Sequence, residues 1–413
     1  MREKKRTCEG LTRRDFIKTV GMAGLASTGW EITRPCAAAE QTEPGNPTLP
    51  RRKLGKTGVE VSVLALGGMF DTVNNQSVLR QARNWGVNFW DTALVYGNGL
   101  SEEGYGRFLS RYPDARKDLF ISTKITPRAL DALTAELDKS LKRLNVECVD
   151  LFHIHCIEDF SQIADPKGFR EWGSRIKRAG KIKLLGFTTH TNMEKCLIDA
   201  AKTDWIDAIM LTYNFRLMNT SKMKEAVAAC AEKGIGLIAM KTQGSGPAKT
   251  ESEAELQITA RFLEKGFTDK QAKIKAVLEN PNIASVCSQM PNLTILSANV
   301  AAARDMPSLS RSDFELLEKF AEETHHTYCA GCGSICSEAV GAAAPISDIM
   351  RCLMYYHDYG ERDLAREVFA GLPGSRHGTL AGIDYSRAEK ACPRKLAISK
   401  LMREACEILK GEG

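Results

Sequence analysis

Short apolar runs alternate with longer helix-like stretches between residues 48 and 306. Each run is five or six residues long and rich in β-branched or other large apolar side chains. Near-continuous apolar strands that alternate with amphipathic helices are typical of a parallel sheet whose outer face is covered by helices. The eight predicted strands are 61–66, 88–92, 119–124, 149–154, 183–188, 208–212, 235–240 and 283–287.

The stretches between these strands carry helix signals. Residues 129–144 and 223–233 have helical apolar spacing, and Gly86, Gly180 and Gly234 stand where a helix C-terminus favours glycine. Eight strand–helix pairs fit a closed (β/α)8 TIM barrel, which typically takes about 250 residues. An open doubly wound sheet would instead carry a G-x-G-x-x-G turn after its first strand, which this chain lacks there. The sequence therefore predicts an α/β fold built on a TIM barrel over residues 48–306.

The first 39 residues have a different character. Residues 12–18, which contain Arg13 and Arg14, are followed by a weakly apolar stretch and then by alanines at 37–39. This order resembles a twin-arginine export signal with its cleavage site, although a disordered basic tail is the alternative. The apolar stretch is shorter than the roughly 20 residues that span a bilayer, so we expect no transmembrane anchor. We predict a leader over 1–39 that engages the twin-arginine export machinery, a linker over 40–47, and a periplasmic or otherwise extracytoplasmic protein.

Composition changes this picture little. Hydrophobic residues make up 43% of the 413 and charged residues 26%. These are ordinary globular values, which exclude a collagen, a coiled coil and a disordered chain. The net charge of +6 comes mostly from the leader. No stripe of Lys and Arg with interleaved aromatic residues follows it, so we expect no nucleic-acid partner.

Titratable side chains follow the predicted strands at the end where a barrel carries its chemistry. Asp91 ends the second strand and Tyr96 comes shortly after it, Lys124 ends the third strand, and the fourth runs into His153 and His155. An acid, a phenol, an ammonium and an imidazole therefore converge on one rim of the barrel.

The segments that carry these side chains resemble the aldo-keto reductases. Residues 52–58 (Arg-Lys-Leu-Gly-Lys-Thr-Gly) are similar to the opening hairpin of that family. Residues 89–106, with Phe-Trp-Asp-Thr-Ala, Tyr-Gly, Ser-Glu and a final Gly, resemble its catalytic signature, and residues 150–155 resemble its fourth-strand signature. The resemblance covers the whole predicted barrel. It implies the catalytic set Asp91, Tyr96, Lys124 and His155, with His155 preferred over His153 by its place in the motif.

The resemblance also implies a mechanism. The function would be that of an NAD(P)-linked oxidoreductase that interconverts a carbonyl (an aldehyde, a ketone or a sugar) and an alcohol. The nicotinamide would supply the hydride chemistry and the protein would position it. Tyr96 would protonate the developing alkoxide, and Lys124 beside it would lower the pKa of the phenol from its usual value near ~10. Asp91 would hold the Lys124 ammonium, and His155 would orient the substrate oxygen.

Cofactor contacts follow from the resemblance at the ends of other strands. The loop after the eighth strand lacks the Lys and Arg that grip the 2′-phosphate of NADP elsewhere in the family, and an anion held without such cations is weakly bound. We therefore expect NADP or NAD as cofactor, with the choice open. The candidate contacts are Gly68, Thr188, Thr189, Lys241, Gln289 and Asn299.

A cysteine-rich extension over residues 307–413, predicted to be mainly helical, follows the barrel. It holds a C-x2-C-x3-C run, Cys329, Cys332 and Cys336, and a distant Cys392 followed by Pro. This pattern resembles iron–sulfur ligation and a subgroup of aldo-keto reductases with a C-terminal cluster segment. We expect a 4Fe–4S cluster. Zinc held by four thiolates, and disulfides or free thiols, are the alternatives.

A second function remains open. Two expected nicotinamide contacts differ from the family: Thr188 and Thr189 stand where Ser-Asn is commoner, and Met210 stands where Gln is frequent. These changes allow a redox-sensing or electron-transfer iron–sulfur protein, with its own electron-transfer partner, on a barrel that no longer reduces carbonyls. A purely structural cluster fits either function.

Overall fold

The structure, a computed structural model, describes residues 49–126, 129–248, 252–372 and 379–410. The predicted leader (1–39) and linker (40–47) lie outside these ranges. No helix within them is long and apolar enough to cross a membrane.

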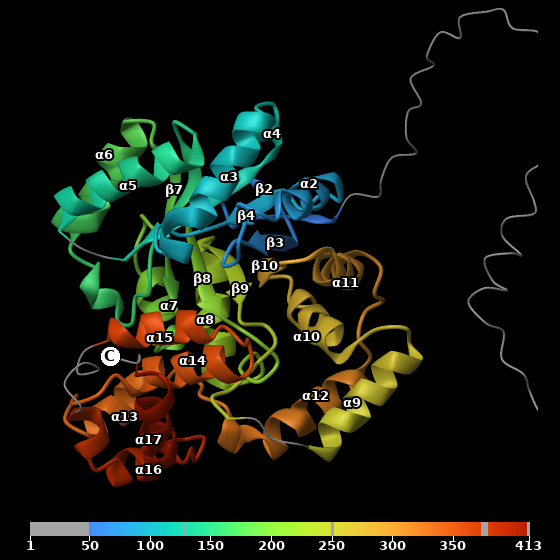
Figure 1. Cartoon of the computed structure of the whole chain (residues 1–413), viewed down its shortest axis with the longest axis vertical. Helices are drawn as coiled ribbons and strands as arrows, with labels where there is room; N and C mark the ends of the chain where they lie inside the picture. Colours follow the sequence, from blue (N-terminus) through green and yellow to red (C-terminus); the bar gives the residue numbers. More distant parts are fainter. Residues whose placement is uncertain (1–48, 127–128, 249–251, 373–378, 411–413) are drawn as a thin grey trace, which may run out of the picture. The chain divides into compact units, whose positions relative to one another are not determined.

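Eight parallel strands close into a barrel, as predicted (Figure 1). Each strand pairs with the next along the chain, and the last pairs with the first. The strands are β3 (Leu64–Gly67), β4 (Phe89–Asp91), β5 (Phe120–Ile125), β6 (Val149–Ile154), β7 (Ile182–Thr189), β8 (Ala208–Thr212), β9 (Gly236–Met240) and β10 (Ile283–Gln289).

The first predicted strand, 61–66, is two strands. Its beginning belongs to β2 (Glu60–Ser62), which pairs antiparallel with β1 (Arg51–Lys53) in an opening hairpin, and the barrel strand β3 starts only at Leu64. Continuous apolar character could not reveal the break, because Val61 of the hairpin is as buried as the barrel strand itself. Together with Leu54 from the hairpin turn, Val61 joins the apolar cluster inside the barrel.

Helices separate the strands along the chain. They are α2 (Gln76–Asn84), α3 (Leu100–Arg111), α4 (Ala115–Asp118), α5 (Leu130–Leu144), α6 (Glu171–Arg178), α7 (Met193–Ala201), α8 (Ser221–Lys233), α9 (Glu253–Glu264), α10 (Asp269–Leu278) and α11 (Leu293–Arg304). The two helices predicted at 129–144 and 223–233 are α5 and α8. Helix α8 begins earlier than predicted because the Thr220 side chain caps it at the Met223 amide. Gly86, Gly180 and Gly234 all have positive φ, as helix-terminal glycines should.

The extension is helical, as predicted, and most of it forms a core of its own. Helix α12 instead packs with α9 and α10 in a separate apolar cluster. The helices α13 to α17 gather in one group in Figure 1. The extension consists of α12 (Arg311–Glu323), η4 (His325–Thr327), α13 (Gly333–Ala339), α14 (Ile346–His357), α15 (Arg362–Ala370), η6 (Thr379–Gly382), α16 (Ser386–Ala391) and α17 (Ile398–Ile408).

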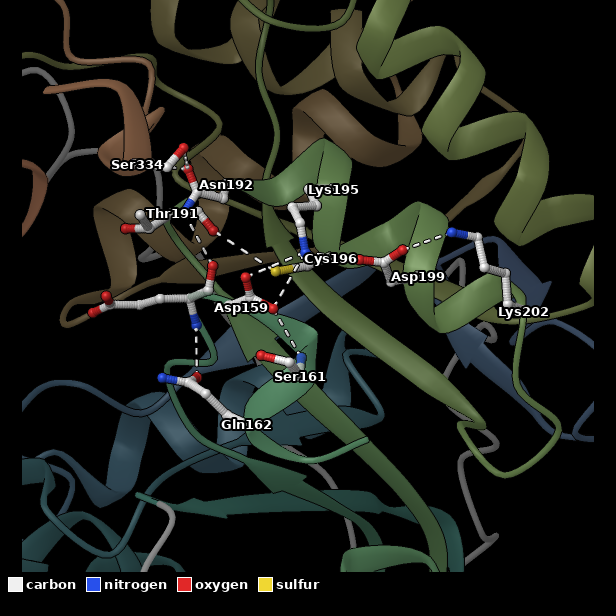
Figure 2. A network of polar contacts seen from close by, with 11 residues as sticks. Asp159, Ser161, Gln162, Thr191, Asn192, Lys195, Cys196, Asp199, Lys202 and Ser334 are labelled. Carbon is white, nitrogen blue, oxygen red and sulfur yellow. Dashed lines mark hydrogen bonds and ion pairs between the residues drawn. The ribbon is translucent and has the colours of Figure 1, made fainter. Parts of the chain in front are cut away.

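The cysteine-rich run is fastened to the loop that follows β7. Figure 2 shows Asn192 at the centre of this contact: its side-chain oxygen accepts hydrogen bonds from the amide and hydroxyl of Ser334. The backbone N–H of Asn192 in turn donates a hydrogen bond of 2.6 Å to the backbone carbonyl of Gly331. Gly331 has φ +74°, and a Cβ there would lie 2.3 Å from the His190 carbonyl oxygen. Only glycine therefore allows this close approach of the extension to the barrel.

Candidate active site

Asp91 and Lys124 form a buried ion pair where β4 and β5 end. Their exposed fractions are 2% and 1%, and the Lys124 Nζ lies 2.5 Å from Asp91 Oδ2. The ammonium also donates to the Thr92 carbonyl at 2.8 Å, and the Ser122 hydroxyl donates to the other carboxylate oxygen at 2.6 Å. Buried charges survive when they are paired and hydrogen-bonded in this way.

Tyr96 lies over this pair. It begins a short helical turn, η1 (Tyr96–Gly99), after β4, and is half-buried. The Lys124 Nζ is 5.0 Å from the centre of the Tyr96 ring, and the ring centre of His155 lies 6.2 Å away at an edge-on angle. The structure therefore brings together all four predicted catalytic residues.

The expected acidification of Tyr96 by Lys124 is wrong for this geometry. Burial, and after it the Asp91 carboxylate, raises the pKa of the Tyr96 hydroxyl well above its usual value. Burial disfavours the charged phenolate, and the Asp91 carboxylate beside Lys124 repels it. In the described part of the chain no hydrogen bond joins the Lys124 ammonium to the Tyr96 hydroxyl. The phenol therefore keeps its proton at neutral pH.

The two candidate histidines have different surroundings. His155 follows β6 directly and faces the Tyr96 ring, whereas His153 is fully buried within the strand. Neither ring nitrogen of His153 has a hydrogen-bond partner within the described ranges. Burial and the nearby Lys124 lower the pKa of both imidazoles well below the usual value, so both are neutral. The placement agrees with the choice of His155.

Several predicted cofactor residues have hydrogen bonds to the protein itself. The Thr188 hydroxyl accepts from the Cys156 amide at 2.9 Å, and the Thr189 hydroxyl donates to the Thr191 carbonyl at 2.8 Å. Gly68 follows β3, and a Cβ there would lie 2.7 Å from both the Ser101 and Tyr105 oxygens. Close packing thus accounts for a glycine at position 68.

The remaining cofactor candidates lie at the ends of β9 and β10 and on α11. Gln289 ends β10 and donates to the Met69 carbonyl at 2.7 Å and to the Glu361 carboxylate of the extension at 3.1 Å. Asn299 of α11 is nearly buried and donates to the Ser288 hydroxyl at 3.0 Å. Lys241 follows β9 with φ +58°, an unfavourable backbone for a residue with a side chain. Such conformations concentrate at functional sites.

The four predicted metal ligands line one pocket of about 350 Å³ in the extension. Most of the other lining residues are apolar, among them Ile335, Met350 and Leu396. Burial raises the pKa of the Cys329 thiol to about 12 and that of Cys336 to about 11, and it also raises the pKa of Cys332. Within the described residues no group of three or more Cys, His, Asp or Glu is arranged to hold a metal ion. The structure therefore brings the four predicted ligands to one pocket.

The extension contributes side chains to the barrel mouth that sequence reasoning missed. A second pocket, of about 450 Å³, is lined by Lys241 and His190 of the barrel and by Arg351 of α14. Tyr355 of the same helix lies against the Lys241 ammonium, which is 4.4 Å from the ring centre. No strand-end signal in the sequence marks Arg351 or Tyr355, because both reach the site from a helix far beyond the barrel.

These neighbours determine the electrostatics of the mouth. Burial, then Arg351, lowers the pKa of Lys241 to about 7. Both cations contribute, after burial, to the low pKa of His190, and they contribute after burial and Lys124 to that of His155. Burial, then Asp348, raises the pKa of Glu158 to about 7. The charges of Lys241 and Arg351 therefore also act on His155, one of the predicted catalytic residues.

Comparison with known proteins matches this architecture. The model of the Aldo/keto reductase family matches residues 64–319. L-galactose dehydrogenase of Arabidopsis thaliana is 27% identical over 65% of this chain and 92% of its own length. D-threo-aldose 1-dehydrogenase of Pseudomonas sp is 23% identical over 61% of this chain and 87% of its own length. Aldo-keto reductase yakc [NADP(+)] of Schizosaccharomyces pombe is 28% identical over 49% of this chain and 60% of its own length.

Solved structures agree on the fold. An aldo-keto reductase of Bacillus halodurans in its holo form superposes with a TM-score of 0.54 at 20% identity, over 66% of this chain and 96% of the other. At this sequence identity the structural match shows that the barrel fold is shared and nothing more. The family therefore has to be decided from the sequence. Because the family model matches more than half of the chain and runs through every barrel strand, the protein belongs to the aldo/keto reductase family of oxidoreductases.

Proposed function

We propose that the protein is an NAD(P)-linked oxidoreductase that interconverts a sugar carbonyl and an alcohol. The observation that carries the proposal is the grouping of Tyr96 and His155 around the Lys124–Asp91 pair at the barrel mouth. The sugar is supported by two relatives whose names give L-galactose and D-threo-aldose as substrates.

Each side chain has a role in carbonyl reduction. A bound nicotinamide would supply the hydride. Tyr96 gives its proton to the substrate oxygen, since an alkoxide is a far stronger base than a phenolate, and a raised pKa keeps the phenol protonated until then. His155 is neutral and donates a hydrogen bond to the same oxygen. Lys124, held by Asp91, lies against the Tyr96 ring and positions it.

Replacement of Tyr96 tests this function. We expect Tyr96→Phe to lower turnover by about 10²- to 10⁴-fold, the usual contribution of a general acid. Tyr112→Phe at the end of α3 is the matched control, because it also removes one phenol hydroxyl but from a tyrosine that packs on Phe108. The measurement is nicotinamide absorbance with an aldose. Equal turnover in both variants would contradict the assigned role.

For the cofactor we propose NAD in preference to NADP. The Gln289 amide, where the family resemblance implies a grip on the 2′-phosphate, is hydrogen-bonded to the Glu361 carboxylate. A carboxylate there repels a phosphate, which would need a guanidinium or ammonium to be held. We expect tighter binding of NADH than NADPH by fluorescence titration, and a smaller difference in Glu361→Gln.

For the extension we propose a 4Fe–4S cluster held by Cys329, Cys332, Cys336 and Cys392. The support is their common pocket and its apolar lining. Iron, sulfide and zinc assays on anaerobically purified protein test this, with Cys392→Ser as the ligand variant and Cys148→Ser as control. One zinc ion per chain and no sulfide would contradict the proposed cluster.

For the leader we propose export by the twin-arginine route, on the residues around Arg13 and Arg14. A fusion of residues 1–47 to a reporter should be exported, and Arg13→Lys with Arg14→Lys should stop it. Export that survives both changes would contradict the proposal.

The second function, an electron-transfer or redox-sensing protein, has one specific observation in its favour. The cysteine pocket and the barrel-mouth pocket share Cys329, Ser347 and Met350, so a group bound in one is next to the other. Titration with NAD(H) and NADP(H) separates the two functions. Failure of all four nucleotides to bind, together with a reversible potential of the metal centre, would favour the second function.

A further inference from the structure

The pocket at the barrel mouth is rich in cationic side chains. Lys241 lies at the end of β9 and Arg351 on α14, and both line the same space of about 450 Å³. The other polar lining residues include His190, Thr212 and Asn214. Thus two elements far apart in the chain each bring one cation to one pocket.

Lys241 is held by aromatic rings rather than by an acid. Its ammonium lies over the faces of two extension tyrosines, at 4.4 Å from the Tyr355 ring centre and 4.9 Å from that of Tyr359. In the ranges that the structure describes, no carboxylate forms an ion pair with it. Two aromatic rings fix the position of an ammonium without neutralising its charge.

Arg351 is only partly neutralised. Its Nη2 lies 2.7 Å from Asp348 Oδ1, and its side chain is 14% exposed. The residues that line the pocket include Lys241 and Arg351 but, among the described residues, no Asp or Glu. Because the pKa of Lys241 is lowered to about 7, a part of its population is an ammonium at neutral pH, and Arg351 is a guanidinium throughout. The lining of the pocket is therefore cationic.

The pocket also lies beside the reaction centre. Arg351 and Lys241 both act electrostatically on His155, the imidazole that orients the substrate oxygen in the proposed function. The side chains for the 2′-phosphate end of a dinucleotide, Gln289 and Asn299, stand instead on β10 and α11. A negative group between Lys241 and Arg351 is therefore distinct from the 2′-phosphate of a dinucleotide, which leaves the substrate and the pyrophosphate as its sources.

We propose that Lys241 and Arg351 form an anion subsite that binds the carboxylate of the substrate. Resting on the proposed function, this names the substrate class as a uronic acid, a sugar with a carbonyl at one end and a carboxylate at the other. Arg351 binds a carboxylate through paired N–H groups, and Lys241 adds a second charge-assisted contact. The inference adds a binding contact and no bond-making step. It makes α14 a specificity element of the barrel.

The experiment compares D-galacturonate with D-galactose, which differ in the carboxylate, by calorimetric titration of the full-length protein. We expect galacturonate to bind more tightly, and Arg351→Met to weaken its binding by about tenfold to a hundredfold, as for a lost hydrogen bond to a charged group. Galactose and NADH affinities should not change. Arg362→Met, which removes an exposed guanidinium from α15, is the matched control and should change none of the three.

Other outcomes separate the sources of the anion. If Arg351→Met and Lys241→Met weaken NADH but not galacturonate, the subsite holds the pyrophosphate and the inference is overturned. Equal binding of the two sugars to the unaltered protein overturns it as well. Should circular dichroism show that Arg351→Met misfolds, Arg351→Lys, which keeps the charge but loses the paired N–H groups, carries the galacturonate comparison.

Turnover distinguishes the inference from the proposed function. Carboxylate-dependent binding without any reaction upholds the subsite and removes the function. Reaction with galactose but no preference for galacturonate upholds the function and removes the subsite.

Discussion

The buried ion pair of Lys124 and Asp91 is hydrogen-bonded on both sides. Asp91 and the Thr92 carbonyl accept from the Lys124 ammonium, and Ser122 holds the other carboxylate oxygen. Removing one member of such a group leaves a buried charge without a partner, which costs more than the pair contributes. At the residue scale, the candidate catalytic centre is therefore also a structural one.

Asp91→Asn tests that coupling. We expect it to lower the free energy of unfolding by about 3–5 kcal/mol, as for a broken buried pair. Asp118→Asn breaks the exposed pair with Arg83, and should cost about 1 kcal/mol or less. Guanidinium denaturation followed by circular dichroism measures both. Equal losses would show that Lys124 is not held as a buried charge.

The lowered pKa of Lys241 leads to a prediction of how the free energy of unfolding depends on pH. Because burial and Arg351 lower its pKa from 10.5 to about 7, the unfolded chain binds its proton more tightly than the folded chain does between these values. Stability then rises with pH across this window by linkage. Lys241→Met should remove that part of the rise. The measurement is the midpoint of denaturation at several pH values between 7 and 10, and the same slope in both proteins would contradict the prediction.

At the element scale, the site depends on the loops and turns after the strands more than on the strands themselves. The turn η1 after β4 brings Tyr96 over Lys124, and the loop after β7 receives the cysteine run. Helix α14 places Arg351 and Tyr355 one turn apart, so both face the barrel mouth. Strands thus position the buried ion pair, while loops and one helix position its neighbours.

Asn192 is the element-scale test. It has φ +51° and accepts both hydrogen bonds from Ser334 (Figure 2), so Asn192→Ala should add a backbone cost of about 1–3 kcal/mol and release residues 329–336. Asn192→Gly also removes the two hydrogen bonds, but glycine adopts a positive φ without strain, so this variant should have a smaller effect. Hydrogen exchange of the 329–336 segment reports the release.

Asn145→Ala is the control for that experiment. Asn145 also has positive φ, at the end of α5, where it contacts Ser110 rather than the extension. Asn145→Ala should lower the global free energy of unfolding without making hydrogen exchange faster in residues 329–336. Faster exchange there in both variants would mean that the segment is not held by Asn192.

At the scale of the whole molecule, the extension is part of the mouth of the barrel. Its Tyr328 accepts a hydrogen bond from the buried Asn214 of the barrel, and its Glu361 accepts one from Gln289. The same extension carries the four cysteines that line one pocket. A group bound there would therefore stabilise the helix that covers the proposed substrate site.

Removal of that group should then affect binding at a distance. We expect anaerobic treatment with an iron chelator, or Cys392→Ser, to lower the unfolding temperature and weaken galacturonate binding together. Cys148→Ser, in the turn before β6 and thus at the opposite end of the strand from His155, should do neither. Loss of the metal without any change in binding would show that the extension keeps its place unaided.

Local sequence carried much of the fold. Apolar runs, helix-terminal glycines and the polar residues at strand ends predicted the barrel and the convergence of Asp91, Tyr96, Lys124 and two histidines on one rim, because strand order alone brings the ends of β4, β5 and β6 together. The choice of His155 over His153 came from the family resemblance. The break between β2 and β3 was missed, since both sides of it are equally buried.

The sequence by itself determined the order of elements and the residue types at the strand ends, because both depend on neighbours close in the chain. Only the tertiary structure decided that burial and the Asp91 carboxylate raise the Tyr96 pKa, and that Arg351 and Tyr355 come to face Lys241. Burial and electric fields depend on groups from distant parts of the chain, and no local pattern records their distances.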